Sequence, residues 1–77
     1  MKIPRKHVFP GGFTVKIEQL EREDFKAENG ADEACFDRDN MTILLDRGRS
    51  KADRKADFIH EMGHAFLDWQ YWYERNG

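Results

Sequence analysis

The sequence predicts an α+β fold, in which a small twisted antiparallel sheet of about three strands packs on one long C-terminal helix. Three observations carry this prediction: alternating apolar residues over 13–18, two apolar stretches around a polar turn over 34–45, and an uninterrupted helical pattern from residue 51 onward. A chain of 77 residues has room for one modest core. We therefore expect a single domain spanning residues 1–77.

The N-terminal segment is expected to be extended and loop-like, because residues 1–12 hold both prolines and a Gly11–Gly12 pair. Val8 and Phe9 fit an edge strand that Pro10 would end. The next segment alternates, with Phe13, Val15 and Ile17 on one face and polar residues on the other. Period-two alternation of this kind predicts a half-buried strand.

The middle of the chain contains a short helix and a hairpin. Residues 19–29 are mostly polar and are expected to form a helix ending at Asn29–Gly30, since glycine is favoured just past a helix end. The apolar stretches 34–36 and 41–45 flank the polar run Asp37–Asn40. Asp and Asn tolerate turn conformations, so this pattern predicts a β-hairpin with a polar tip.

The C-terminal third is expected to form one helix of roughly 24 residues. Ser50 stands three residues before Asp53, as in a capping box. At about 100° per residue the helix carries an apolar stripe, made of Ile59, Met62, Gly63, Phe66, Trp69 and Tyr73. A glycine inside a helix lowers its stability, so Gly63 suggests a close approach by another backbone, such as the hairpin.

The pattern His-Glu-x-x-His at residues 60–64 is the chemical centre of the sequence. His60 and His64 lie one turn apart on one face, so both imidazoles can reach a single ion. Zinc suits neutral imidazole and can hold a water molecule at an open position. Glu61 lies beside the pair, where its carboxylate can take a proton from that water. The pattern therefore predicts Zn²⁺ as cofactor and the chemistry of a zinc metallopeptidase.

The stretch from Phe58 to Asp68 resembles the active helix of gluzincin-type metallopeptidases, and most closely that of the small ImmA/IrrE-like peptidases of phages and mobile elements. The likeness covers residues 34–68, since a similar hairpin precedes the helix in that family. It implies a zincin-like fold, with His60 and His64 as zinc ligands and Glu61 as general base. It also implies that the edge strand, residues 34–37, binds the substrate backbone by strand addition.

A catalytic zinc normally has three protein ligands and a water molecule. In the family the third ligand, usually Glu, comes from a helix well downstream, and this chain ends soon after Asp68. Asp68 is our first choice for the third ligand, although on a straight helix it is about 12 Å along the axis from His60, so the helix would need a bend. His7 and Cys35 lie outside the helix and are the alternatives.

The charge, apolar content and cysteine count of the chain argue against binding to nucleic acid or insertion in a membrane. The net charge of −2 provides no global field for nucleic acid, and the basic residues at 2–7 are expected to form a solvated tail. No stretch is long and apolar enough for a membrane span or a signal peptide. Cys35 is the only cysteine, so no intrachain disulfide forms, and a reducing, cytoplasmic location is expected. The expected partner is a peptide or protein substrate.

Two other functions compete with the peptidase. In the first, zinc only stabilises a catalytically weak or inactive zincin-like binding module of phage type. In the second, the chain is a metal-free interaction domain that uses its aromatic C-terminus. Whichever function holds, Tyr71 and Trp72 are candidates for a homodimer contact or for a wall of the substrate groove.

Overall fold

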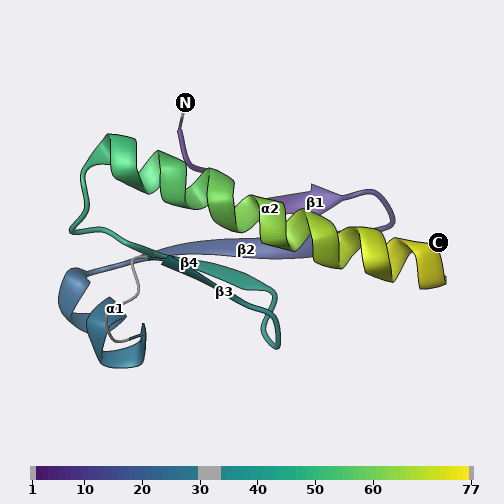
Figure 1. Ribbon diagram of the computed structural model, residues 1–77, viewed down its shortest axis with the longest axis horizontal. Helices are drawn as coiled ribbons and strands as arrows, with labels where there is room; N and C mark the ends of the chain where they lie inside the picture. Colours follow the sequence, from purple (N-terminus) through teal and green to yellow (C-terminus); the bar gives the residue numbers. More distant parts are fainter. Residues whose placement is uncertain (1, 30–33, 77) are drawn as a thin grey trace.

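A computed structural model describes residues 2–29 and 34–76 of the chain. Six elements follow one another (Figure 1): β1 (Lys6–Phe9), β2 (Phe13–Leu20), α1 (Arg22–Asn29), β3 (Ala34–Asp37), β4 (Thr42–Asp46) and α2 (Lys51–Asn76). The α+β class, the edge strand at Val8 and Phe9, the hairpin and the long C-terminal helix are confirmed. The predicted short helix begins later than expected, because the strand continues through Gln19 and Leu20. The helix does run to Asn29; Gly30 lies outside the described residues.

The sheet has four strands in the order β1-β2-β4-β3. β1 pairs with β2 and β3 pairs with β4 in antiparallel fashion, but β2 and β4 are parallel, with Lys16 opposite Thr42 and Leu20 opposite Asp46. The prediction of an antiparallel sheet of about three strands was therefore wrong in strand number and in direction. After β2 the chain passes through α1 and returns along β3, so the β3–β4 hairpin brings β4 back in the direction of β2. Residue alternation reports which face of a strand is buried, and it carries no information about strand direction.

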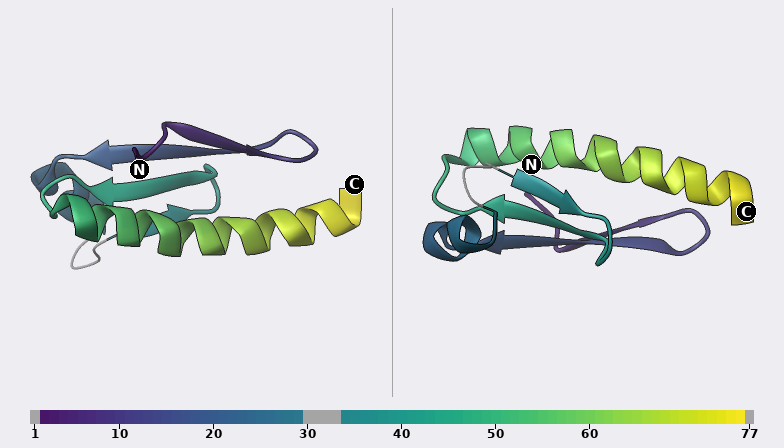
Figure 2. Two further views of the ribbon diagram at one scale, coloured as in Figure 1. Left: turned by 90° about the horizontal axis from the view of Figure 1, so that it is seen from above. Right: turned by 60° about the horizontal axis from the view of Figure 1, so that its bottom comes forward.

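Helix α2 covers one face of the sheet and runs alongside its strands, over the β4 and β3 side (Figure 2). The main core cluster lies between the sheet and α2, and its fully buried side chains are Val15, Ile43, Leu45 and Ala65. Phe25 of α1 is also fully buried, outside this cluster. Phe58 from α2 and Ile17 from β2 are also buried in this cluster. The core thus fixes the face that α2 turns toward the sheet.

The apolar stripe predicted for α2 was partly wrong. Met62 and Trp69 do pack against the core, but Ile59, Phe66 and Tyr73 are exposed. The core-facing line passes instead through Phe58 and Ala65. Apolar residues occupy neighbouring positions at 58–59 and 65–66, so periodicity alone left two adjacent faces equally apolar.

Gly63 also differs from its prediction. A Cβ placed on Gly63 would meet nothing within 4 Å, so no other backbone approaches this glycine. The β3–β4 hairpin packs instead beside the face of α2 that carries Ala65. Gly63 therefore leaves open space on the exposed side of the helix, next to the two histidines.

Candidate metal centre

The first turn of α2 sets the rotation of the helix that carries the histidines. The backbone N–H of Asp53 donates to Ser50 Oγ over 3.1 Å, and the N–H of Arg54 donates to the Ser50 carbonyl over 2.9 Å. This confirms Ser50 as the N-cap residue. Arg49, in the preceding loop, holds the Asp57 carboxylate through Nε at 2.7 Å. The helix is thus anchored at its start and positioned by the core further along.

His60 and His64 face each other along the exposed side of α2. Their Nε2 atoms are 3.3 Å apart, and their ring centroids are 5.0 Å apart with the rings at 75°. Four residues along a helix bring two side chains to the same face, one above the other. Both imidazoles are exposed, and no apolar side chain seals them from solvent, so an ion could reach both nitrogens.

Glu61 lies on the inner side of this pair and is only 8% exposed. One carboxylate oxygen of Glu61 and one nitrogen of each histidine all lie within 4.8 Å of one another. Within residues 2–29 and 34–76, no group donates a hydrogen bond to Glu61. The Glu61 oxygens are not among the shielded polar atoms left without a partner in the described residues, so they keep contact with solvent and a cation at the histidines could reach them.

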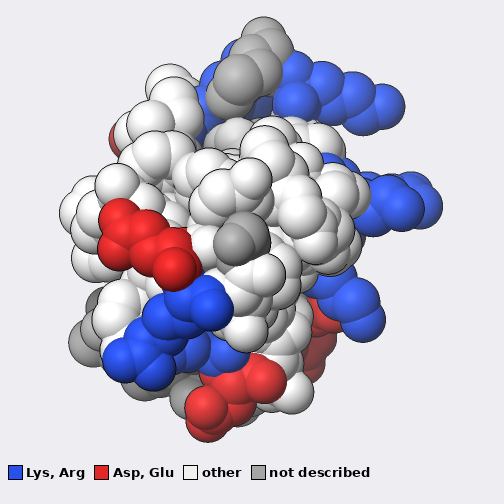
Figure 3. Space-filling view, turned by 90° about the vertical axis from the view of Figure 1, so that its right-hand side faces the viewer, with Lys and Arg blue, Asp and Glu red and all other residues white. Residues whose placement is uncertain are grey.

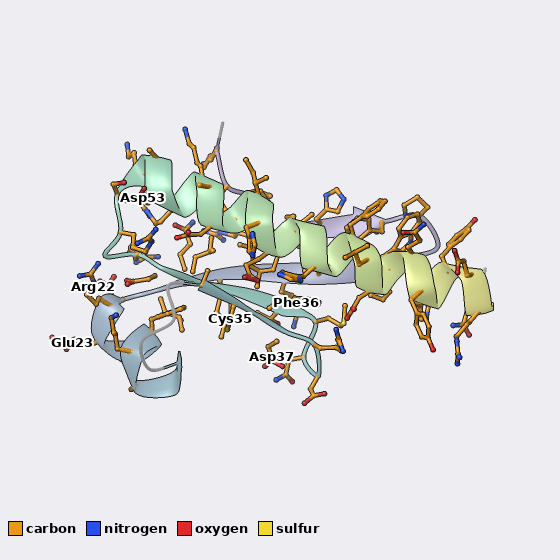
Figure 4. The ribbon with its side chains drawn as sticks, in the orientation of Figure 1. Arg22, Glu23, Cys35, Phe36, Asp37 and Asp53 are labelled. Atoms are coloured by element: carbon orange, nitrogen blue, oxygen red, sulfur yellow. The ribbon has the colours of Figure 1, made fainter. Side chains whose placement is uncertain are left out.

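A hollow of about 390 Å³ opens between α2 and β3 beside these residues. Its lining consists of Ala34, Cys35, Phe36, Arg38, Glu61 and His64. Among the strands that the structure describes, β3 is the outer one, beyond β4. In Figure 4, Cys35 and Phe36 follow one another along β3, below the middle of α2. The candidate metal ligands therefore lie beside a sheet edge.

Asp68 is not part of the group formed by His60, Glu61 and His64. Its Oδ2 accepts a hydrogen bond from Arg38 Nε over 2.8 Å, and the pair links α2 to the hairpin turn. Asp68 lies one helical turn beyond His64, and α2 continues unbroken through both residues. The helix therefore does not bring the Asp68 carboxylate to the histidines.

Neither alternative third ligand joins the group. His7 lies in β1, the strand at the opposite edge of the sheet from β3, and its ring packs edge-on against Phe9 at 4.5 Å between centroids. Cys35 lines the hollow, but its sulfur is not among the ligand atoms brought together with the histidines. Arg38, which also lines the hollow, was missed by sequence reasoning. A single arginine in a polar hairpin tip gives no sequence signal that it will fold back onto the helix.

The aromatic C-terminus divides into packed and exposed rings. Trp69 stacks on Phe9 with centroids 5.4 Å apart, and its Nε1 donates to the Pro10 carbonyl over 2.9 Å. Trp72 packs against Phe13 at 5.3 Å between centroids. Tyr71 is exposed, with the Arg75 guanidinium 4.6 Å from its ring centroid. Viewed from this end, the molecule presents a broad uncharged surface with charged side chains around its margin (Figure 3).

Comparisons of the chain with protein-family models, with curated proteins and with solved structures find no significant match. Across the part of the chain that the structure describes, no helix combines the length and apolar character needed to cross a membrane.

Proposed function

We propose that this chain is a zinc-dependent peptidase, in which His60 and His64 hold the metal and Glu61 is the general base. The observation that carries the proposal is the convergence of these three side chains within 4.8 Å beside a hollow at the sheet edge. The resemblance to gluzincin-type metallopeptidases, drawn from the sequence, assigns the same roles to the same residues.

The distance between the histidine nitrogens supports the choice of metal. Two zinc–nitrogen bonds of about 2.0–2.1 Å at a tetrahedral angle separate the nitrogens by about 3.3–3.4 Å. The two Nε2 atoms of His60 and His64 are 3.3 Å apart. Imidazole nitrogens are also among the donors that zinc prefers. The separation of the two nitrogens, which without a metal is also that of a hydrogen bond, therefore matches the separation that zinc requires.

Each protein group has a separate task in the proposed reaction. A bound zinc ion supplies Lewis acidity and lowers the pKa of a water molecule. Glu61 is close enough to the histidines to accept the proton of an attacking water molecule and to pass it to the leaving amine. Glu61 is 8% exposed as a residue, and its place at the border of the protein interior strengthens its electrostatic interactions.

The outer edge of the sheet at β3 is the proposed site of the substrate backbone. An extended peptide can pair with an exposed strand edge through main-chain hydrogen bonds, and this would lay it across the hollow beside Glu61 and His64. Arg38 lines the same hollow, so its guanidinium is available to contact an acidic or carbonyl group of the substrate.

A second function, a zinc-stabilised module without hydrolytic activity, is favoured by one observation. Asp68, the third ligand predicted from the sequence, is held by Arg38 and lies outside the group. A metal held by His60, Glu61 and His64 together would use the base as a ligand. Such a site would stabilise the fold but would leave no free carboxylate to activate water.

The test separates metal binding from hydrolysis. Protein stripped with chelator and reloaded with one equivalent of zinc is incubated with a mixed peptide library, and the products are identified by mass spectrometry. We expect cleavage with zinc, none with chelator, and loss of cleavage in Glu61→Gln with zinc still bound. Glu74→Gln, an exposed glutamate further along α2, is the matched control and should cleave normally. Zinc binding without cleavage would favour the stabilised module, and absence of zinc binding would overturn both.

A further inference from the structure

In the first two turns of α2, basic and acidic side chains lie on different faces of the helix. Lys51, Arg54 and Lys55 are spaced i, i+3 and i+4, so they share one side of the helix. Asp53 and Asp57 are rotated by roughly half a turn from that side. Asp57 is engaged by Arg49, in the loop before the helix. One face of the helix start is therefore purely cationic, although the whole chain has a net charge of −2.

This cationic face forms one wall of a hollow of about 330 Å³. Three segments far apart in the sequence line it, namely the N-terminal stretch with Lys2 and Ile3, β2 with Gln19, and α2 with Lys51, Arg54 and Lys55. None of the described residues that line it is acidic. Its four cationic side chains make no ion pair with any carboxylate of residues 2–29 and 34–76. The hollow thus gathers positive charge that the protein itself leaves uncompensated.

Arg54 supplies a second, independent observation. Its Nη1 donates to Gln19 Oε1 over 2.8 Å, which holds the guanidinium against β2. Its Nε is shielded from solvent and has no acceptor in the structure. A shielded N–H group without an acceptor is unfavourable. Among the described residues this is the one buried side-chain nitrogen or oxygen left without a partner, and it belongs to a residue that lines the cationic hollow.

We propose that this hollow binds the phosphate group of a small phosphorylated molecule. Guanidinium recognises phosphate oxygens through its fixed fork of N–H groups, and lysine ammonium groups add point charges. The volume lies at the lower end of the range of small-molecule sites, enough for a phosphate and a modest attached group. Ser50 already accepts the Asp53 N–H at the helix start, so the proposed site depends on side chains and not on the helix terminus.

The hollow favours a small ligand over a nucleic acid strand. Its walls converge from three segments to form a local concavity, whereas a strand is followed by an extended basic groove with stacking aromatic rings. None of the described lining residues is aromatic. The site is also separate from the metal centre, because its last helical residue, Lys55, precedes His60 by more than one turn. In Figure 4, Asp53 marks this start of α2, well before the part of the helix that overlies Cys35 and Phe36.

The experiment is an NMR titration of the ¹⁵N-labelled full chain at constant ionic strength with inorganic phosphate, pyrophosphate and AMP. We expect saturable shifts of the amides of Gln19 and of residues 51–55. The double variant Lys51→Gln/Lys55→Gln should weaken binding by about tenfold or more, since two charge-assisted contacts are lost. The control Lys16→Gln/Lys26→Gln makes the same change in charge at exposed lysines outside the hollow and should weaken it less than about twofold.

A further variant tests the guanidinium itself. Arg54→Lys keeps the charge but replaces the planar fork of guanidinium N–H groups with a single ammonium, so we expect weaker binding of pyrophosphate with an otherwise unchanged spectrum. Absence of saturable shifts with all three probes would overturn the proposal. Equal loss of phosphate affinity in the two double variants would also overturn it, because it would indicate only diffuse electrostatic attraction. A single-stranded oligonucleotide that binds about tenfold tighter than AMP at the same salt concentration would overturn the assignment to a small molecule. All of these titrations are run with chelator present, so their outcome is independent of the proposed peptidase.

Discussion

Arg38 Nε donates to Asp68 Oδ2 over 2.8 Å, and this contact fastens the turn between β3 and β4 to α2 one helical turn beyond His64. The pair occupies the carboxylate that the sequence offered as a third metal ligand. It also places a guanidinium at the rim of the hollow that Glu61 and His64 line. Asp68 could therefore act either as a metal ligand or as an anchor for Arg38, and the ion pair seen in the structure favours the second role.

Asp68→Asn tests which role holds. If Asp68 only anchors Arg38, its loss should change zinc affinity by no more than about fivefold, the size of effect expected from a largely exposed ion pair. His64→Asn should reduce zinc affinity by at least about 100-fold, because even the outer partners of metal ligands contribute 10–100-fold. Isothermal titration with zinc measures both. A loss in Asp68→Asn as large as that in His64→Asn would make Asp68 a ligand.

Gly63→Ala should stabilise the protein by up to about 1 kcal/mol, since alanine is favoured over glycine inside a helix. The added Cβ meets nothing within 4 Å. Gly12 is the matched control, because a Cβ there also meets open space but the backbone has φ of +84°. Gly12→Ala should therefore destabilise the protein. Urea unfolding of both variants gives the two signs, and a destabilised Gly63→Ala would contradict the open space found beside this residue.

Asp37 makes the hairpin tip sensitive to acid. The side-chain amide of Asn40 donates to Asp37 Oδ2 over 2.7 Å, and this bond, with help from the backbone N–H groups of Asn40 and Asp39, lowers the pKa of Asp37 below its ordinary value of 3.8. Because the folded pKa is the lower one, the stabilisation is fully present above the ordinary pKa. It is lost as the pH falls through the folded pKa.

Asp37→Asn should therefore lower the Tm near neutral pH, and the difference from the natural sequence should shrink in strong acid. The scans are run with chelator so that release of a bound metal in acid does not contribute to the Tm. Asp39→Asn changes a neighbouring carboxylate at the same tip and should show a Tm difference that varies less with pH. If the Tm difference between Asp37→Asn and the natural sequence stays constant from neutral pH into strong acid, the charge of Asp37 contributes nothing to stability.

Trp69 connects α2 to the β1–β2 hairpin through its ring and its indole N–H. Trp69→Phe keeps an aromatic ring near Phe9 but removes the hydrogen bond to the Pro10 carbonyl, so it should cost about 1 kcal/mol. Tyr71→Phe, a change at an exposed ring, should stay within about 0.5 kcal/mol. Equilibrium unfolding in urea measures both costs. If the two variants are equally stable, the hydrogen bond from the Trp69 indole N–H to the Pro10 carbonyl adds nothing to the free energy of unfolding beyond what a hydrogen bond to water would give.

The sequence predicted the parts of this structure that local chemistry decides. Alternation located β2, the Asp37–Asn40 run located the hairpin turn, and the Ser50 cap located the start of α2. The pairing of His60 with His64 followed from helical periodicity alone. Each of these depends on residues within a few positions of one another, which is the range over which sequence patterns are informative.

What the sequence could not predict depends on contacts between distant segments. The direction of β4 relative to β2 follows from the path through α1 and β3, and the buried face of α2 follows from which side meets the sheet. Arg38 reaches Asp68 across 30 positions of sequence. The cationic hollow is lined by both Lys2 and Lys55, which are far apart in the sequence. Its helical wall could have been predicted, because residues 51, 54 and 55 share one face of the helix, opposite Asp53 and Asp57.

The parallel pairing of β2 with β4 divides the sheet into two hairpins that meet along one central seam. Each hairpin closes over a few residues, whereas the seam joins Lys16 to Thr42 and cannot form until the chain between them has doubled back. We therefore expect docking of the two hairpins to be slower than the closing of either one. The candidate metal ligands lie later in the sequence than that junction, on α2 beside β3. A ligand held by α2 and β3 would then reinforce the later half of the chain first. Its effect would reach the N-terminal hairpin through the seam and through the contacts of Trp69 with Phe9 and Pro10.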